Sequence, residues 1–154
     1  MNVDRVVGKK MNNFSARSDR GILYNNDSLK GKITLVNFWF TECPGCIGEF
    51  EILNHVYDSL RSYPDFRLLA FTFDPPDVII KTKSKYHLRY ELISVSQEEC
   101  YNLNFNYGFP TNLVIDKSAI IRCIQTGGPP DLANPNREMR FELTVIPALR
   151  NLLK

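Results

Sequence analysis

The feature that most constrains this chain is a pair of cysteines, two residues apart, at the junction of a predicted strand and a predicted helix. Residues 33–40 are almost continuously apolar and rich in β-forming side chains, which is typical of a strand buried on both faces. Pro44 follows, and proline suits the first turn of a helix. Apolar residues then recur at helical spacing to about residue 61. Cys43 and Cys46 are therefore predicted to lie at the start of a helix that follows a buried strand.

This position favours a reactive sulfur. The unpaired N–H groups and the positive dipole end of a helix N-terminus stabilise a thiolate, which is the nucleophile in thiol–disulfide exchange. We predict that Cys43 is the exposed nucleophile and that Cys46, one turn on, is the buried resolving thiol. Glu49 is predicted to lie half-buried near Cys46 with a raised pKa, where it can take and return the proton of the resolving thiol.

The other cysteines argue against a metal site. A structural zinc ion takes four ligands, and the chain has no second CxxC and no Cys/His pair to complete such a set. Cys100 and Cys123 each fall on the apolar side of a predicted element, so we expect both to be buried core residues. Neither a metal nor an organic cofactor is expected.

The remaining pattern predicts an α/β domain. Residues 1–13 read as a loose arm, and residues 1–27 as this arm followed by a small hairpin. Residues 28–154 are expected to form one domain with a mixed central sheet flanked by helices on both faces. The elements expected after the first helix are strands at 66–73 and 92–95, helices at 75–87 and 96–106, a hairpin of 111–115 with 119–126, a break at 127–130, and a last helix from about 137 to 153.

Composition excludes several classes of protein. The 154 residues carry a net charge of only +2 without a basic stripe, which disfavours a nucleic-acid partner. No apolar run approaches the roughly 20 residues of a membrane span. The polar N-terminus lacks the apolar core of a signal peptide, so we expect either a cytoplasmic protein or one whose targeting segment is absent from this chain.

Two motifs together resemble the TlpA/ResA-like branch of the thioredoxin superfamily. They are Val36-Asn37-Phe38-Trp39 followed by Cys43-Pro44-Gly45-Cys46, and Tyr107-Gly108-Phe109-Pro110-Thr111 followed by Leu113-Val114-Ile115-Asp116. The resemblance covers about residues 28–154 and implies a thioredoxin-like fold with a short N-terminal β-hairpin. The chain departs from the family pattern at Glu42, where tryptophan is usual, and at Glu51, where proline is usual.

The resemblance also implies roles for individual residues. Pro110 should follow a cis peptide bond and pack beside the reactive disulfide, and Phe109 should offer backbone hydrogen bonds to a bound substrate chain. Independently of the resemblance, Trp39 is expected to be a core residue and a wall of the substrate-binding site rather than a catalytic residue. Glu49 matches the acidic residue that the family places near the buried thiol.

The expected function is thiol–disulfide exchange between the Cys43–Cys46 pair and protein thiols or disulfides, with an upstream redox partner. The alternatives are a peroxiredoxin-like peroxidase and a thioredoxin-like metallochaperone. Members of the family are commonly found in the bacterial periplasm or anchored at the cell envelope, which implies the same location here, with any membrane anchor outside this chain.

Overall fold

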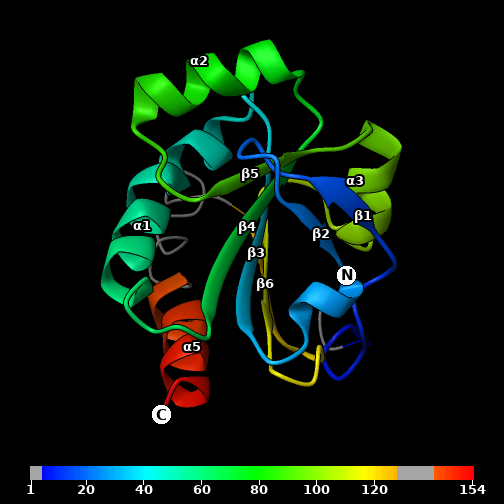
Figure 1. Ribbon diagram of the computed structural model, residues 1–154, viewed down its shortest axis with the longest axis vertical. Helices are drawn as coiled ribbons and strands as arrows, with labels where there is room; N and C mark the ends of the chain where they lie inside the picture. Colours follow the sequence, from blue (N-terminus) through cyan, green and yellow to red (C-terminus); the bar gives the residue numbers. More distant parts are fainter. Residues whose placement is uncertain (1–4, 128–140) are drawn as a thin grey trace.

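A mixed five-stranded sheet forms the centre of the protein, in the order β5-β4-β3-β6-β7 (Figure 1). The computed structural model describes residues 5–127 and 141–154. β3 pairs in parallel with β4 and antiparallel with β6, so the sheet is mixed. Its strands are β3 (Ile33–Trp39), β4 (Phe66–Thr72), β5 (Glu91–Ser94), β6 (Thr111–Ile115) and β7 (Ile121–Thr126).

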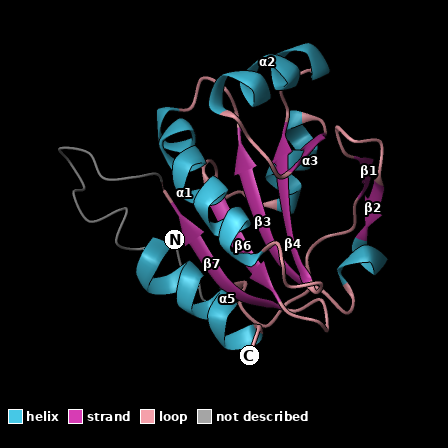
Figure 2. Ribbon diagram, turned by 60° about the vertical axis from the view of Figure 1, so that its left-hand side comes forward, coloured by secondary structure: helices cyan, strands magenta, loops and turns pink. Residues whose placement is uncertain are grey.

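Helices cover both faces of this sheet. Figures 1 and 2 show α1 and α5 across one face, while α3 and the N-terminal hairpin lie against the other. None of the described helices is both long and apolar enough to cross a membrane. The helices are α1 (Pro44–Leu60), α2 (Pro76–Tyr86), α3 (Gln97–Leu103) and α5 (Ile146–Leu152), with a 3-10 turn at Asn26–Leu29. The hairpin strands are β1 (Ser15–Arg17) and β2 (Leu23–Asn25).

The sheet separates two apolar cores. The first lies under α1 and α5 and includes Cys43, Cys46 and Phe50. The second lies under α3 and the N-terminal segment and includes Cys100 and Leu103. β3 is buried along its whole length because it serves both cores, which confirms the interpretation of its continuous apolar run.

The described part of the N-terminal arm is packed, and the prediction of a loose arm at residues 1–13 is wrong for residues 5–13. Val6 and Met11 are buried in the second core. The backbone beside them pairs with the start of β7, through a bridge between Lys10 and Ile120 and a hydrogen bond from the Gly8 N–H to the Ile121 carbonyl. This pairing supplies hydrogen-bond partners to part of the open backbone edge of β7, and the two apolar side chains anchor the arm in place.

Two helix ends differ from their predictions. α3 ends at Leu103 rather than near residue 106, because Phe105 and Asn106 adopt left-handed backbone angles that a helix cannot continue through. The start predicted for the last helix, at about residue 137, lies outside the described residues. Most of the break predicted at 127–130 also lies outside them. From 141 the chain forms a π-helix, Phe141–Val145, and only then α5. Pro147 has no N–H to continue the regular ladder, and this accounts for the change.

Candidate active site

Cys43 and Cys46 form a disulfide at the N-terminus of α1, so the protein is described in its oxidised state. Cys43 is the N-cap residue of α1. Its Sγ accepts a hydrogen bond from the backbone N–H of Cys46 at 3.2 Å, and its carbonyl accepts from the N–H of Ile47 at 3.1 Å. No acidic residue lies in the first turn of α1. The sulfur of Cys43 therefore lies at the positive end of the α1 dipole and accepts a hydrogen bond from the Cys46 N–H.

Both sulfur-bearing side chains are shielded in this state. Cys46 is 1% exposed, as expected for a resolving thiol. Cys43 is 7% exposed, which is less than its predicted exposure at a helix start. The disulfide itself and the packing of Phe40 and Phe109 against the same core explain the difference. Of the two, Cys43 remains the more accessible sulfur.

Glu49 is more deeply buried than its position on the flank of the helical stripe suggested. Its side chain is 4% exposed, three residues after Cys46 on the same helix. The Asn112 amide donates to its two carboxylate oxygens at 3.1 and 3.3 Å. Burial raises the pKa of Glu49 to about 8, although the hydrogen bond from Asn112 works in the opposite direction. The carboxyl therefore changes charge near neutral pH.

A second loop meets the disulfide loop through aromatic rings. The peptide bond between Phe109 and Pro110 is cis, the geometry that the family resemblance implied. The Phe109 ring lies 5.2 Å from that of Phe40 and 5.6 Å from that of Phe73, and Tyr101 packs against it at 5.4 Å. The Phe40 carbonyl in turn accepts a hydrogen bond from the Cys43 N–H at 3.2 Å. These contacts join the loop before Pro110 to the loop before Cys43.

Trp39 lies beneath the site rather than on its surface. Its side chain has no exposed area, and its ring packs edge-on against Phe50 of α1 at 5.5 Å. This burial confirms the prediction that Trp39 is a core residue, whereas a wall facing the substrate would need exposed area that Trp39 lacks in this state. Its position instead supports the first turns of α1, on which both cysteines lie.

The two solitary cysteines occupy different environments. Cys100 is fully buried in the second core, as predicted, and burial together with Glu99 and Asp74 raises its pKa to about 12. Cys123 lies on β7 and is only half-buried, although burial still raises the pKa of its thiol.

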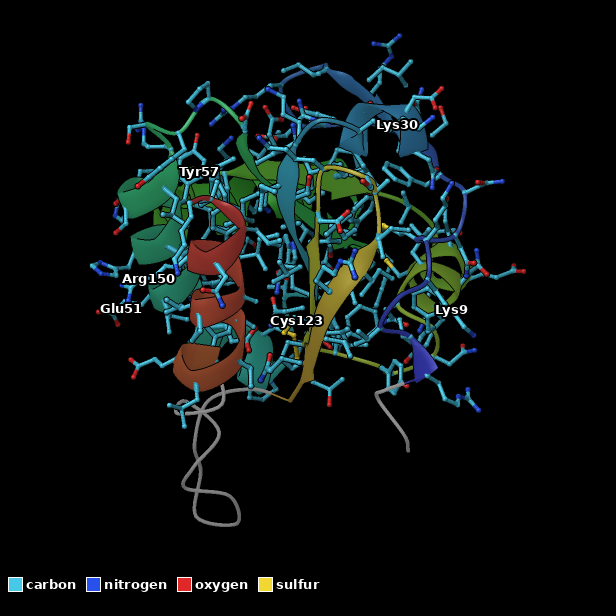
Figure 3. The ribbon with its side chains drawn as sticks, turned by 90° about the horizontal axis from the view of Figure 1, so that it is seen from below. Lys9, Lys30, Glu51, Tyr57, Cys123 and Arg150 are labelled. Atoms are coloured by element: carbon cyan, nitrogen blue, oxygen red, sulfur yellow. A yellow bond between two sulfur atoms is a disulfide. The ribbon has the colours of Figure 1, made fainter. Side chains whose placement is uncertain are left out.

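In Figure 3 Cys123 is seen on its strand, with Glu51 on the outer side of α1. The departure from the family pattern at Glu51 is therefore on an exposed surface.

Both sulfurs of the CxxC pair are bonded to each other. Over residues 5–127 and 141–154, no three His, Cys, Asp or Glu side chains gather in a way that could hold an ion.

The sequence reasoning missed the amides beside Glu49. Asn37, Asn112 and Gln125 lie side by side on β3, β6 and β7, since Asn37 pairs with Asn112 and Asn112 with Gln125 in the strand register. A signal was present, because Asn37 and Asn112 are polar residues inside otherwise apolar strands. Such residues need buried hydrogen-bond partners, and Glu49 is one of them.

Comparison with known sequences is consistent with this geometry. The AhpC/TSA family matches residues 7–124, which is most of the chain. A thiol-disulfide oxidoreductase ResA from Bacillus thuringiensis (strain Al Hakam) is 28% identical over 115 residues. That match covers 72% of this chain but 64% of the relative, so the chain spans less than two thirds of the length of ResA.

Solved structures agree on the fold. A thiol:disulfide interchange protein of the thioredoxin family from Chlorobium tepidum TLS superposes with a TM-score of 0.70 at 22% identity, covering 96% of this chain and 97% of the other. StoA from Bacillus subtilis superposes with a TM-score of 0.65 at 19% identity, covering 76% and 89%. The chain therefore belongs to the AhpC/TSA family, with a thioredoxin-like fold and with ResA thiol-disulfide oxidoreductases among its relatives.

Proposed function

We propose that this protein is a thiol–disulfide oxidoreductase that exchanges its Cys43–Cys46 pair with thiols or disulfides of other proteins. One observation carries the proposal: the pair forms a disulfide at the N-terminus of α1, where the Cys46 N–H donates to the sulfur of Cys43. The same contact is available to a Cys43 thiolate, and hydrogen bonds to a charged sulfur lower the pKa of its thiol. The similarity to ResA supports the same activity.

The proposed reaction begins with the reduced protein. The Cys43 thiolate attacks one sulfur of a substrate disulfide, forms a mixed disulfide, and releases the other substrate sulfur as a thiolate that takes up a proton. No metal or organic cofactor enters this step, because the electron pair that forms the new S–S bond comes from the attacking thiolate.

The second half of the reaction regenerates the disulfide described here. The ionised Glu49 carboxylate accepts the proton of the Cys46 thiol, and the resulting thiolate attacks the sulfur of Cys43. The second substrate sulfur leaves as a thiolate and is protonated. Two electrons have then passed from the protein to the substrate, and a partner dithiol restores the reduced form by the same exchange. Replacing Glu49 with glutamine should slow this second step by about 10²-fold, the low end for general base catalysis, because water can substitute.

In this proposal the substrate chain lies against the loop before Pro110. The Phe109 backbone is assigned the hydrogen bonds to the substrate, and Pro110 shapes the loop beside the disulfide. Support comes from the contact between the rings of Phe40 and Phe109, which brings this loop to the disulfide loop. Trp39 is assigned a supporting role beneath α1 because its side chain is fully buried.

The activity can be tested by the reduction of a protein disulfide, such as those of insulin, with dithiothreitol as the source of electrons. We expect a rate well above that of dithiothreitol alone. A rate equal to that of dithiothreitol alone, with the Cys43–Cys46 pair shown to be reduced, would contradict the proposal. The reduction potential of the pair then gives the direction of electron flow in the cell.

The peroxidase alternative makes a different prediction, namely rapid consumption of hydrogen peroxide. The hydroxyl of Thr41, two residues before Cys43, donates to the Asp74 carboxylate, and the Thr41 N–H donates to the same oxygen at 2.8 Å. Asp74, which follows the end of β4, therefore holds this threonine through both hydrogen bonds. We expect little peroxidase activity, and peroxide consumption faster than protein-disulfide reduction would favour the alternative.

The proposal extends to the compartment and partners. A periplasmic or cell-envelope location is supported by the similarity to ResA thiol-disulfide oxidoreductases and by the resemblance to the TlpA/ResA-like branch, whose members are commonly found there. An upstream dithiol or disulfide protein, and an anchor outside this chain, complete the proposed system. Fractionation of the host cell, with thiols trapped before lysis, tests the location; recovery in the cytoplasmic fraction contradicts it.

A further inference from the structure

Three buried amide side chains form a row whose central member donates to the Glu49 carboxylate, and we call this row the amide chain. It consists of Asn37 on β3, Asn112 on β6 and Gln125 on β7. The Asn37 amide donates to the Asn112 carbonyl oxygen at 2.8 Å, and the Asn112 amide donates to the Gln125 carbonyl oxygen at 2.9 Å. The Gln125 amide donates to the backbone carbonyls of Thr126 and Gly127 at the end of its strand. Backbone pairing fixes the row, because its members are direct cross-strand neighbours.

Asn112 is the central member, and both hydrogens of its amide are used. An amide nitrogen carries two hydrogens. One is directed to Gln125, and the other is shared between the two oxygens of Glu49 at 3.1 and 3.3 Å. Its oxygen accepts from Asn37. The orientation of the Asn112 amide follows from this network, since the reversed amide would place an oxygen against the carboxylate.

The other groups around Glu49 offer its charge no compensation. Cys46 lies on the same helix, Tyr90 is fully buried before β5, and Cys123 lies on the same face of β7 as Gln125. Burial is the main cause that raises the pKa of Tyr90, and the negative charge of Glu49 adds to it, so the two groups lie within electrostatic reach. No cation contributes to the pKa of Glu49, and in the described part of the chain Asn112 is the one side chain that donates to it.

We propose that Asn112 is a positioning residue for the exchange reaction: held by Asn37 and Gln125, its amide orients the Glu49 carboxylate beside Cys46 and stabilises the ionised form. The inference rests on the proposed function, in which ionised Glu49 takes the proton of Cys46. Asn112 touches neither the disulfide nor a substrate in this scheme and acts only through Glu49. The chemistry of the first step, at Cys43, should therefore be independent of Asn112.

The test compares the titration of Glu49 in the wild type and in Asn112→Leu. In the oxidised protein, the carboxyl signal of Glu49 is followed by carbon-13 NMR from pH 5 to pH 10, with no substrate present. Leucine keeps the approximate shape and removes the donor, so the pKa of Glu49 should rise by about one unit, a tenfold change in proton affinity. A failure of the exchange activity itself leaves this measurement intact, so the two failures can be told apart.

The kinetic readout is the rate of mixed-disulfide resolution by Cys46, measured by stopped flow. The midpoint of its pH profile should move upward with the pKa of Glu49, which at neutral pH slows resolution up to about tenfold. The alkylation rate of Cys43 and the KM for the substrate should stay at their wild-type values. A merely structural role for Asn112 would change stability without moving the pH midpoint.

Asn54→Leu is the matched control. Like Asn112, Asn54 is a buried asparagine, and it lies on α1, the helix of Glu49. Its side chain bonds the backbone of Tyr86 and Arg89 and makes no bond to Glu49. It should cost stability and leave the titration of Glu49 unchanged. An unchanged titration of Glu49 in folded Asn112→Leu, or an equal shift in Asn54→Leu, would overturn the proposal.

Two further variants keep the test decisive if Asn112→Leu does not fold. Asn112→Val suits a strand position and removes the same donor, so the same rise in the pKa of Glu49 is expected. Gln125→Leu removes only the anchor of Asn112 and should produce a smaller rise. If neither Asn112 variant folds, a wild-type titration in Gln125→Leu overturns the proposal, and a rise supports it.

Discussion

The N-termini of α1 and α3 have the same capping geometry and opposite chemistry. Each helix begins after a side chain that accepts a hydrogen bond from the backbone N–H three residues on: the sulfur of Cys43 from Cys46 at 3.2 Å, and the hydroxyl of Ser96 from Glu99 at 3.0 Å. Each helix also carries a buried cysteine close behind its cap, Cys46 in α1 and Cys100 in α3.

The difference lies in where the sulfur meets the helix and which charges accompany it. Cys43 occupies the cap itself, and the first turn of α1 holds no acidic residue. Cys100 lies beyond the first turn of α3, with its own N–H bonded to the Ser96 carbonyl and with Glu98 and Glu99 in the first turn. Burial and negative neighbours raise the pKa of Cys100 to about 12. Burial, position on the helix and local charge therefore act together to separate a redox cysteine from a core cysteine.

The largest effect should come from removing one cysteine near the start of each helix in turn and comparing the two variants. Cys43→Ala should reduce protein-disulfide reductase activity to the uncatalysed background, because the nucleophile is absent. Cys100→Ala should retain activity close to wild type, at a stability cost of about 1 kcal/mol for a small core vacancy. Loss of activity in folded Cys100→Ala would break the comparison.

Alkylation of the reduced native protein measures the same contrast directly. A thiol with a pKa near 12 is about 10⁻⁵ ionised at neutral pH, whereas an unperturbed thiol is a few per cent ionised. We expect Cys43 to react with iodoacetamide at least about 10³-fold faster than Cys100, with half-buried Cys123 between them. Peptide mapping by mass spectrometry identifies the labelled cysteine, and early labelling of Cys100 would refute the assignment.

Glu49 should make stability fall with rising pH. Its pKa is about 8 in the folded protein and near 4.5 in the unfolded chain, so folding favours the protonated carboxyl. This contribution is fully present below pH 4.5 and is lost progressively as pH rises to about 8. Relative to Glu49→Gln, the wild type should lose about 3 kcal/mol of unfolding free energy between pH 4.5 and pH 7. Urea denaturation of the oxidised proteins checks this, and parallel pH profiles would contradict it.

The smallest effect concerns the exposed charge beside Cys43. Glu42 precedes the nucleophile and lies at the surface, where water and salt screen its charge. Glu42→Gln should lower the pKa of the Cys43 thiol by less than about half a unit, and added salt should shrink the difference. A shift of more than one unit would mean that this exposed carboxylate, and not the helix start, dominates the acidity of Cys43.

Local patterns were sufficient to predict the disulfide loop. The apolar run of β3, Pro44 and the helical spacing after it all lie within one stretch of sequence, so the strand, the cap and both cysteines could be located together. The hairpin β1-β2 and the succession of strands and helices along the chain were predicted in the same way. Pro147 was also visible in the sequence, but its interruption of the last helix was overlooked.

Contacts between distant segments were not predictable. The hydrogen bond from Asn112 to Glu49 spans 63 residues and depends on the register between β6 and its neighbours, which no local pattern specifies. The packing of Val6 and Met11 likewise depends on a bridge from Lys10 to Ile120 across the fold. The sequence therefore located the cysteine pair at the start of a helix, and the structure was needed to find what surrounds it.

The most direct test of the account is the location of the substrate sulfur in Cys46→Ser. Without its resolving thiol, the reduced variant should stop at the mixed disulfide when it is given a peptide disulfide. Mass spectrometry should place the peptide on Cys43 alone. A peptide attached to Cys100 or Cys123, or no adduct at all in a folded protein, would contradict the claim that the start of α1 provides the nucleophile.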